Sequence, residues 1–360
     1  MKKSSLLLIL LLFSTAIFSQ DNTYIRSSQY FHYTGTVSKN LSITADLTII
    51  NDTSISGYYS YNNYGVPILL RGKIFTDKKI LLYEYDHDWQ KTAELKGIFD
   101  QSKITGTFLN LKTNKKSPFL FHISDNANSI IFKGFSYYNK KYIKPINDGP
   151  SCTINYNVLY PEKISNNAVY DSITSCIKNT FFSGSLVNDP VKLLYNCADS
   201  AFATFFESNP DTTNLDNMLY MQSWDYDEDV RIIYNTNDIL SIEFFAYYYT
   251  GGAHGGYGSI YRNIDLKTGK TISLDDILKT GYKDELSEIL TKSLRKQYGM
   301  NEKDILADNG FFVEKIDPSS NYYLTNKGIG FVYNPYEIAS FANGTIDIFV
   351  PFSEIANIVK

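Results

Sequence analysis

Five short runs of alternating apolar and polar residues, each with a glycine at its centre, restrict most what the first part of the chain can fold into. The runs are Tyr33–Val37, Ile55–Tyr59, Leu70–Ile74, Leu95–Phe99 and Ile104–Phe108. Alternation with a period of two is typical of strands that bury one face. A glycine within such a strand indicates a bend or a close approach of another backbone. Residues 21–147 are therefore predicted to form an all-β domain, either a meander or a small barrel.

The pattern changes at Asn147-Asp148-Gly149-Pro150, a turn-forming segment that indicates a domain boundary. Beyond it, strands and helices come in groups rather than in strict alternation. This grouping predicts an α+β fold for residues 148–360, with antiparallel sheets and flanking helices. Two subdomains are expected, 148–250 and 251–360. Helices are predicted over 164–182, from Pro190 onward, at 275–278, over 282–298 and at the C-terminus, and strands near 153–160, 218–225, 230–235, 240–250, 257–266, 322–325, 330–333 and 345–351.

The N-terminus has the features of an export signal. Lys2 and Lys3 precede the apolar stretch Leu6–Phe18, which is followed by Ser19-Gln20 and the polar Asp21. A stretch of this length with these flanks is typical of a signal peptide rather than of a spanning helix. Residues 1–20 are therefore predicted to be removed, and the protein is expected to be periplasmic or secreted. No later segment is apolar enough to predict a stable membrane span.

Charge and cysteine content narrow the class of protein further. The chain has 360 residues and a formal net charge of −4, which argues against a nucleic-acid-binding protein, because such proteins carry basic patches. Of the three cysteines, Cys176 and Cys197 fall in neighbouring predicted helices, about equally far from the turn near 186–188. An antiparallel helix hairpin would bring the two thiols level, so a Cys176–Cys197 disulfide is predicted, with small buried thiols as the alternative.

Patterns that would carry catalysis or bind a cofactor fail in their details. The loop Gly251–Gly256 lies between two predicted strands, whereas a phosphate-binding loop leads into a helix and ends in Lys-Ser or Lys-Thr. The four histidines lack metal-ligand spacing. The acidic run Trp224–Asp229 opens like a calcium loop, but Val230 and Thr236 stand where an EF-hand has Gly and Glu. We therefore predict a solvated hairpin turn for this run, and no cofactor, no metal and no catalytic residue.

Several motifs in the second half appear in a distinctive order. They are Tyr248-Tyr-Thr-Gly-Gly-Ala-His-Gly255, Asn263-Ile-Asp-Leu-Lys-Thr-Gly-Lys270, Leu274-Asp-Asp-Ile-Leu278, Phe311-Phe312, Tyr323-Leu-Thr-Asn-Lys-Gly328 and Tyr333-Asn-Pro-Tyr-Glu-Ile-Ala339. With the preceding segment from Thr153 to Phe206, this order resembles the extracytoplasmic C-terminal region of RsiV-like anti-sigma factors, which sense lysozyme. The same region accompanies the peptidoglycan deacetylase PdaC as a non-catalytic module.

The resemblance implies an extracytoplasmic recognition module that binds a lysozyme-like protein or peptidoglycan. Anti-sigma activity does not carry over, because a predicted signal peptide stands where such sensors have a sigma-binding segment and a spanning helix. Deacetylase activity does not carry over either, because the chain lacks the His and Asp clusters of that metal-dependent domain. We therefore expect a non-catalytic envelope-binding protein, and an envelope glycan-modifying enzyme is the alternative.

The expected contact surface combines the glycine-rich loop with a later turn. Its residues are Tyr247, Tyr248, Tyr249, Thr250, Gly251, Gly252 and His254 from the loop, and Tyr333, Asn334, Pro335, Tyr336 and Glu337 from the turn. Tyrosine suits such a surface, since its ring is apolar and its hydroxyl is polar. A purely structural role also fits each segment: a tight connection between strands for the loop, and aromatic packing at a strand end for the turn.

Overall fold

The computed structural model describes residues 24–86, 89–100, 102–124, 129–143, 149–162, 164–209 and 223–360. The predicted signal peptide lies outside these residues, as does the Asn147-Asp148 part of the predicted boundary. Among the helices that the structure describes, none is long and apolar enough to cross a membrane.

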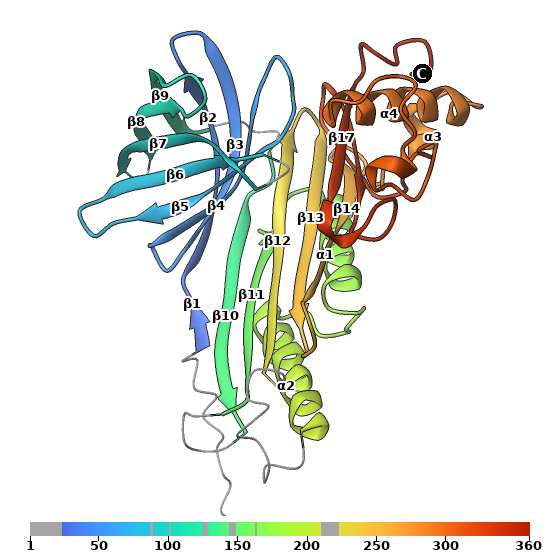
Figure 1. Cartoon of the computed structure of the whole chain (residues 1–360). Coiled ribbons are helices and arrows are strands. Elements are labelled where there is room, and N and C mark those ends of the chain that lie inside the picture. The colour runs from blue at the N-terminus through green and yellow to red at the C-terminus, as the bar shows by residue number, and fades with distance from the viewer. Residues whose placement is uncertain are drawn as a thin grey trace, which may run out of the picture.

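The first part of the chain is an eight-stranded antiparallel barrel (Figure 1), which confirms the predicted all-β fold. Its strands are β2 (Ser28–Val37), β3 (Leu41–Ile50), β4 (Ser54–Tyr61), β5 (Ile68–Ile74), β6 (Lys79–Tyr85), β7 (Lys91–Asp100), β8 (Lys103–Asn110) and β9 (Lys115–Ile123). Each strand pairs with the next. The last strand, β9, pairs back to β2 from Tyr33↔Ile123 to Val37↔Phe119, and this pairing closes the barrel.

Side chains fill the interior of the barrel. Tyr33, Tyr59 and Phe121 are among the largest fully buried side chains. The five glycines at the centres of the alternating runs lie where neighbouring strands approach closely. A Cβ at any of them would come within 1.9–2.1 Å of a carbonyl oxygen of the adjacent strand. Glycine is required there because no other residue leaves room for that approach.

Five long strands form the central sheet, which continues from the barrel. They are β10 (Phe132–Tyr142), β11 (Ser151–Pro161), β12 (Trp224–Thr236), β13 (Ile239–Tyr249) and β14 (Gly256–Asp265), and the short β1 (Ile25–Arg26) pairs with β10. The strands are antiparallel except for β11 and β12, which run parallel. The predicted division after residue 147 stays a prediction; β10 lies before it and pairs with β11 along its whole length.

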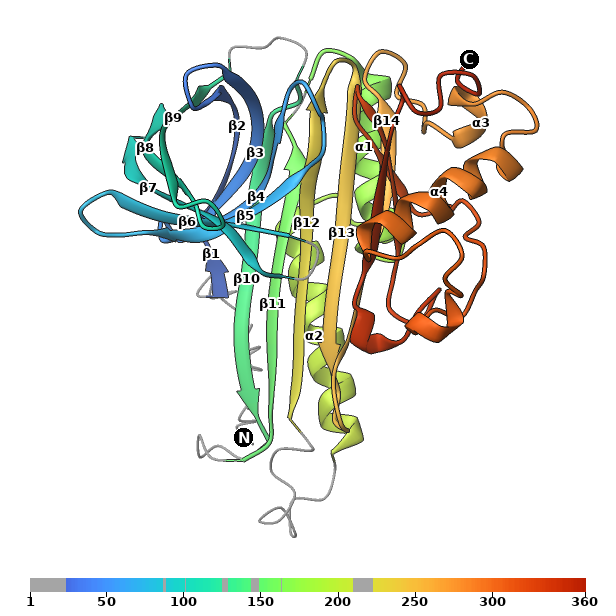
Figure 2. The same cartoon turned by 45° about the horizontal axis from the view of Figure 1, so that its top comes forward.

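Two helices, α1 (Asn167–Thr180) and α2 (Pro190–Ser208), connect β11 to β12 and cover one face of the central sheet (Figure 2). The start of α2 follows from its sequence. The Asp189 carboxylate accepts hydrogen bonds from the backbone N–H groups of Val191 and Lys192, and Pro190 occupies the first turn. Because helices cover one face, the barrel strands β3 and β4 contact β12 from the other.

The prediction of a solvated hairpin turn for the acidic run Trp224–Asp229 is wrong. The run is the first half of strand β12. It pairs with β11 on one side and with β13 on the other. The run alternates: Trp224 packs on Phe205 of α2, with ring centroids 5.6 Å apart, whereas Asp227 and Asp229 bond to asparagines of β11. The alternation with aromatic residues is that of a strand, and the aspartates are tolerated because amide donors lie opposite them.

The last part of the chain, here called the C-terminal layer, packs beside β14. It contains α3 (Leu274–Ile277), α4 (Lys283–Gln297), the 3-10 helices η3 (Ala307–Asn309) and η4 (Phe341–Asn343), and the antiparallel strands β15 (Tyr322–Leu324), β16 (Gly328–Tyr333) and β17 (Ile346–Pro351). Leu286, Leu290 and Leu294 form the buried stripe of α4, as its amphipathic pattern predicts.

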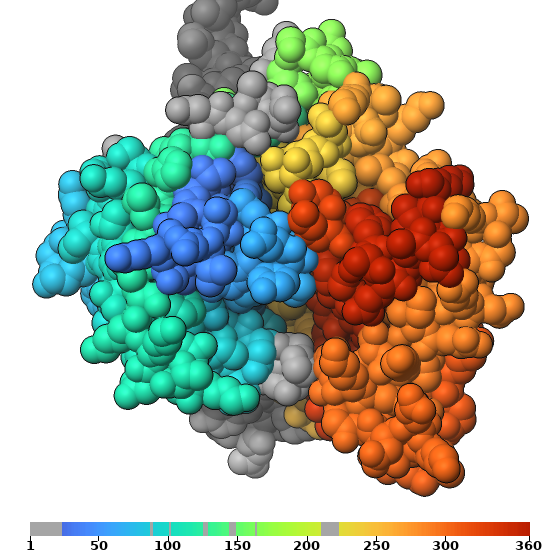
Figure 3. All heavy atoms as spheres, turned by 90° about the horizontal axis from the view of Figure 1, so that it is seen from above, coloured from blue at the N-terminus to red at the C-terminus, as the bar shows by residue number. Residues whose placement is uncertain are grey.

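The predicted C-terminal helix is wrong. The residues after β17 form turns, because Val359 bridges to Leu278 and the Lys360 N–H donates to the carbonyl of Ile277. These backbone bonds tie the chain end to the segment after α3. In the view of Figure 3, the barrel and the C-terminal layer lie side by side and meet along a seam.

Candidate ligand-binding cleft

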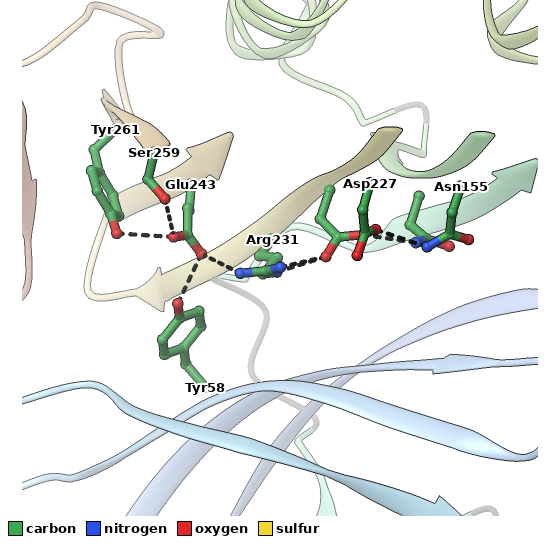
Figure 4. Close-up of polar contacts among 9 residues, drawn as sticks. Tyr58, Asn155, Asp227, Arg231, Glu243, Ser259 and Tyr261 are labelled. Carbon is green, nitrogen blue, oxygen red and sulfur yellow. Dashed lines mark hydrogen bonds and ion pairs between the residues drawn. The ribbon is translucent and has the colours of Figure 1, made fainter. Parts of the chain in front are cut away.

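A row of polar side chains crosses the face of the central sheet that points away from the helices. We call it the polar row; it comprises Asn155, Asn157, Asp227, Asp229, Arg231, Glu243, Ser259 and Tyr261 (Figure 4). Strand register places these residues together: Asp227 lies opposite Asn155, Arg231 opposite Glu243, and Glu243 opposite Tyr261. Residues that alternate along each strand point to the same face, so the row forms one continuous strip.

Glu243 is the centre of the polar row. Its Oε1 accepts hydrogen bonds from the hydroxyls of Ser259 at 2.7 Å and Tyr261 at 3.0 Å. Its Oε2 accepts from the hydroxyl of Tyr58 at 2.8 Å, and Tyr58 belongs to strand β4 of the barrel. One buried carboxylate therefore joins the barrel to the central sheet (Figure 4).

Arg231 balances the charge of this carboxylate. Its guanidinium contacts Glu243 at 3.3 Å and forms a two-nitrogen contact with Asp229, which also accepts from Asn157. Burial opposes the charged guanidinium, but Asp229 and Glu243 outweigh that effect and raise the pKa of Arg231 well above its ordinary value. A buried ion pair with this many partners fixes geometry, and it is costly to break from one side.

A cleft of about 520 Å³ opens beside Glu243, where the three parts of the chain meet. The barrel contributes strands β4 to β7 and Trp89, the central sheet contributes β12 to β14, and the C-terminal layer contributes β15, β17 and the end of α4. Aromatic rings line all three walls, among them Trp89, Phe245 and Phe349. The volume lies in the range of small-molecule sites, which are concave and largely apolar with a few polar groups.

Two further carboxylates stand on opposite walls of the cleft. Asp347 of β17 accepts from the Tyr323 hydroxyl at 3.0 Å, and burial with the nearby Glu243 raises the pKa of Asp347 to about 7. Glu84 of β6 accepts from the hydroxyls of Tyr59 and Thr92, and burial raises its pKa as well. Carboxyl groups that line a cleft and have raised pKa values are typical of functional sites.

The structure brings the two segments of the expected contact surface together at the edge of this cleft. His254 of the loop stacks on Phe341 of η4, with centroids 4.2 Å apart, and Tyr336 of the turn lies 5.8 Å from the same ring. The Asn334 side chain accepts from the Ser259 N–H at 2.8 Å. Tyr257 contacts Phe341 and also lines the cleft. We call this group of rings, His254, Tyr257, Tyr336 and Phe341, the aromatic rim.

Individual residues of that expected surface differ in exposure. Tyr248 and Tyr336 are more than half exposed, and His254 is exposed too. Tyr333, by contrast, is buried in the core of the C-terminal layer, where its hydroxyl donates to the carbonyl of Asp317. Its inclusion as a contact residue is therefore wrong, because it sits on the inner face of β16.

The expected disulfide is also absent, since Cys176 and Cys197 are both free thiols in the structure. Cys176 of α1 lies near Arg262 of β14, whereas Cys197 of α2 lies near Glu228 of β12. The two helices direct their thiols toward different strands. Burial raises the pKa of each thiol to about 11, so both are unreactive small side chains.

Sequence reasoning missed most of the cleft residues, although a signal for some was present. Glu243 and Asp347 are single acids within the apolar strands Leu240–Phe245 and Ile346–Val350. A lone charge in a buried strand requires partners, and this requirement marks it as part of a polar network. Their convergence with Tyr58 could not be predicted, because it depends on how the barrel docks. Among the described residues, no group of His, Cys, Asp and Glu could hold a metal ion.

Fold and cleft together define an α+β protein with an attached barrel and a ligand-sized cleft between its parts. Residues 147–257 match the family model described as "Deacetylase PdaC", and residues 275–353 match the one described as "Protein of unknown function (DUF3298)". The chain is thus similar to envelope-associated modules, and the coarser part of the predicted resemblance is confirmed. Its specific likeness to the RsiV type stays a prediction.

One solved structure shows the same similarity at the level of the fold. A member of the DUF3298 family from Bacteroides fragilis is 25% identical, with a TM-score of 0.58, and the match covers 65% of this chain and 95% of that one. A DUF3298 family protein from Pseudomonas aeruginosa is 17% identical, with a TM-score of 0.44, over 64% of this chain and 94% of that one. No curated protein matches the chain.

Proposed function

We propose that the protein is an exported, non-catalytic recognition module of the cell envelope that binds glycan strands in the cleft. The observation that carries this proposal is the convergence of three walls on one concave site lined by aromatic rings and carboxylates. Sugar rings present apolar faces that pack on aromatic side chains, and their hydroxyls donate to carboxylates. The matches to the family models described as "Deacetylase PdaC" and DUF3298 support an envelope setting.

The state of the carboxylates favours binding over catalysis. Glu243 is held by three hydroxyls and an arginine, and Asp347 and Glu84 each accept from hydroxyl groups. A general acid or a nucleophile of a glycosidase must reach the glycosidic bond and carry a proton to or from it. Glu243, which is fixed by several donors, is better suited to orienting a ligand than to that exchange.

Co-sedimentation with purified peptidoglycan tests the proposal. The chain without residues 1–20 is expected to sediment with the polymer, and Trp89→Ala is expected to reduce the bound fraction at least about fivefold by removing one aromatic wall. Ile98→Ala is the matched control, since Ile98 is an exposed apolar residue of the barrel that does not line the cleft. Failure of the unmodified chain to sediment, or equal sedimentation of Trp89→Ala, would overturn the proposal.

The same samples test the enzyme alternative. Muropeptide mass spectra of the incubated polymer are expected to be unchanged. New masses that disappear in Asp347→Asn would replace the binding proposal with a glycan-modifying enzyme.

The aromatic rim supports a second candidate, a lysozyme-like protein as ligand. His254 and Tyr336 expose ring surface beside Phe341, and the net negative charge of the chain would steer a basic partner toward it. Titration calorimetry with a basic lysozyme should show heat that Tyr336→Ala abolishes. No heat at micromolar concentrations would exclude this ligand and would leave the glycan proposal intact.

A further inference from the structure

Resting on the proposed glycan function, we propose that the cleft selects sugars that carry a free amino group, protonated to ammonium, over their N-acetylated counterparts. The juxtaposition that carries this inference is an excess of carboxylates over cations in a cavity with aromatic walls.

Acids outnumber bases around the cleft. Glu84, Asp86, Glu243 and Asp347 line it, and Arg231 is the cation among the lining residues. Arg231 already forms ion pairs with Asp229 and Glu243 on the central sheet. The second cation nearby, Arg71, lies with its guanidinium 5.0 Å from the ring centroid of Trp89, and it interacts electrostatically with Asp229 and Glu243. Among the residues that the structure describes, neither Glu84 nor Asp347 forms an ion pair, and each is held by hydroxyl groups instead.

The carboxylates of Glu84 and Asp347 lie where one ligand can contact two walls of the cleft. Glu84 belongs to the barrel and Asp347 to the C-terminal layer, and both line the same cavity. Each receives hydroxyl donors, Thr92 at 3.2 Å for Glu84 and Tyr323 at 3.0 Å for Asp347, and these hold the carboxyl groups in place. A carboxylate has room for further donors, and an ammonium group offers three.

The aromatic walls favour an amino sugar over a cation without a ring, because a sugar ring can pack on them. Trp89, Phe245 and Phe349 offer ring surface on which a sugar can pack. One face of Phe245 lies against Arg231 and one face of Trp89 against Arg71, so the ammonium is recognised by the carboxylates rather than by these rings. An N-acetyl group would remove the charge and bring a bulkier neutral substituent to the carboxylates. The site therefore combines ring packing with charge recognition, and each contribution can be removed separately.

Titration calorimetry with three oligomers tests the selectivity: a glucosamine tetramer, an N-acetylglucosamine tetramer and tetralysine. At about pH 7 and physiological salt, the glucosamine tetramer is expected to bind at least about tenfold more tightly than either of the others, as a charge-assisted hydrogen bond would give. Equal binding of the two sugars would overturn the amine selectivity and leave glycan binding standing. Tetralysine that binds as tightly as glucosamine would overturn the sugar selectivity, and no binding of either sugar contradicts both proposals.

Two variants separate the cleft carboxylate from a general charge effect. Asp347→Asn keeps an acceptor for the Tyr323 hydroxyl and is expected to lose most of the preference for glucosamine. Glu228→Gln is the matched control: burial together with Asp227 and Asp229 raises the pKa of Glu228 to about 7, but Glu228 lies on the helix side near Cys197. It should bind both sugars like the unmodified chain, and a loss of preference in Glu228→Gln equal to that in Asp347→Asn would overturn the assignment.

Proton release gives a readout that a merely structural role of Asp347 would not move. Near pH 7 this carboxyl group is partly protonated, because burial raises its pKa to about 7, and an ammonium beside it favours ionisation. The heat of binding should therefore depend on the ionisation enthalpy of the buffer. That dependence should differ between the unmodified chain and Asp347→Asn, and identical proton release in the two proteins would contradict a direct contact.

Discussion

Replacing Asp347 by asparagine should stabilise the protein more at about pH 8 than at about pH 5. Burial raises the pKa of this carboxyl group from 3.8 to about 7 in the folded state. The folded protein therefore binds a proton more tightly than the unfolded chain does, and its stability falls as the pH rises from about 4 to about 7. An amide does not ionise, so the variant escapes this loss.

The size of the effect follows from the pKa difference. Each unit corresponds to about 1.4 kcal/mol, so the ionised group costs about 4 kcal/mol above pH 7 and about 1.6 kcal/mol at pH 5 if no water reaches it. Because the cleft is open to solvent, we expect the stability gain of Asp347→Asn to be about 1–3 kcal/mol larger at pH 8 than at pH 5.

Urea denaturation followed by circular dichroism at the two pH values measures this difference. Asp77→Asn serves as the control, since Asp77 is exposed and its pKa is lowered by hydrogen bonds from Lys79. That variant should show no gain at pH 8. A gain for Asp347→Asn that is the same at both pH values, or a loss at both, would refute the description of Asp347 as a buried carboxylate without a cation.

Three further substitutions test the architecture around the cleft. Arg231→Met should lower the free energy of unfolding by about 3–5 kcal/mol at neutral pH in urea titrations, because it leaves buried carboxylates unpaired; a loss below about 1 kcal/mol would contradict the ion-pair network. Tyr58→Phe removes the hydroxyl bonded to Glu243 and should cost about 1–3 kcal/mol in the same assay, and an unchanged midpoint would show that the barrel is not held there. Gly330→Ala should lower the melting temperature, since its Cβ would lie 2.0 Å from the Tyr323 ring; an unchanged value in calorimetry would refute that packing.

The barrel could be predicted from the sequence because its signals are local. Each strand of the barrel alternates within itself, and each central glycine indicates the close approach of another strand, as Gly97 and Gly106 do opposite one another. The amphipathic stripe of α4 and the Asp189 cap of α2 are local signals as well. In such elements the residues that indicate a strand or a helix lie within a few positions of one another.

The acidic strand β12 was misread because its stabilising partners are distant in sequence. Asp227 and Asp229 would be unfavourable in an isolated strand, and their amide donors Asn155 and Asn157 lie in β11, beyond the two helices. The parallel pairing brings these four side chains together. Propensity over a short window favours a turn, and the tertiary partner reverses that preference.

Part of the candidate site could also be predicted from local sequence, and part of it could not. The glycine-rich loop and the Tyr336 turn were predicted together, and they meet in the structure through Phe341, a residue without a sequence signal of its own. The cleft beside them needs the barrel, the central sheet and the C-terminal layer at once. No local pattern contains that arrangement, so the meeting of Glu84 and Asp347 in one cleft could be found only in the folded protein.

Hydrogen–deuterium exchange of the mature chain, with and without solubilised peptidoglycan fragments, tests the central claim most directly. If the cleft is the glycan site, backbone amides of β6, β13 and β17 should become protected together, because these strands form its three walls. The strands β8 and β9 on the far side of the barrel should be unchanged. Protection confined to the outer barrel strands, or no protection at saturating fragment, would contradict the claim that the three-walled cleft is the binding site.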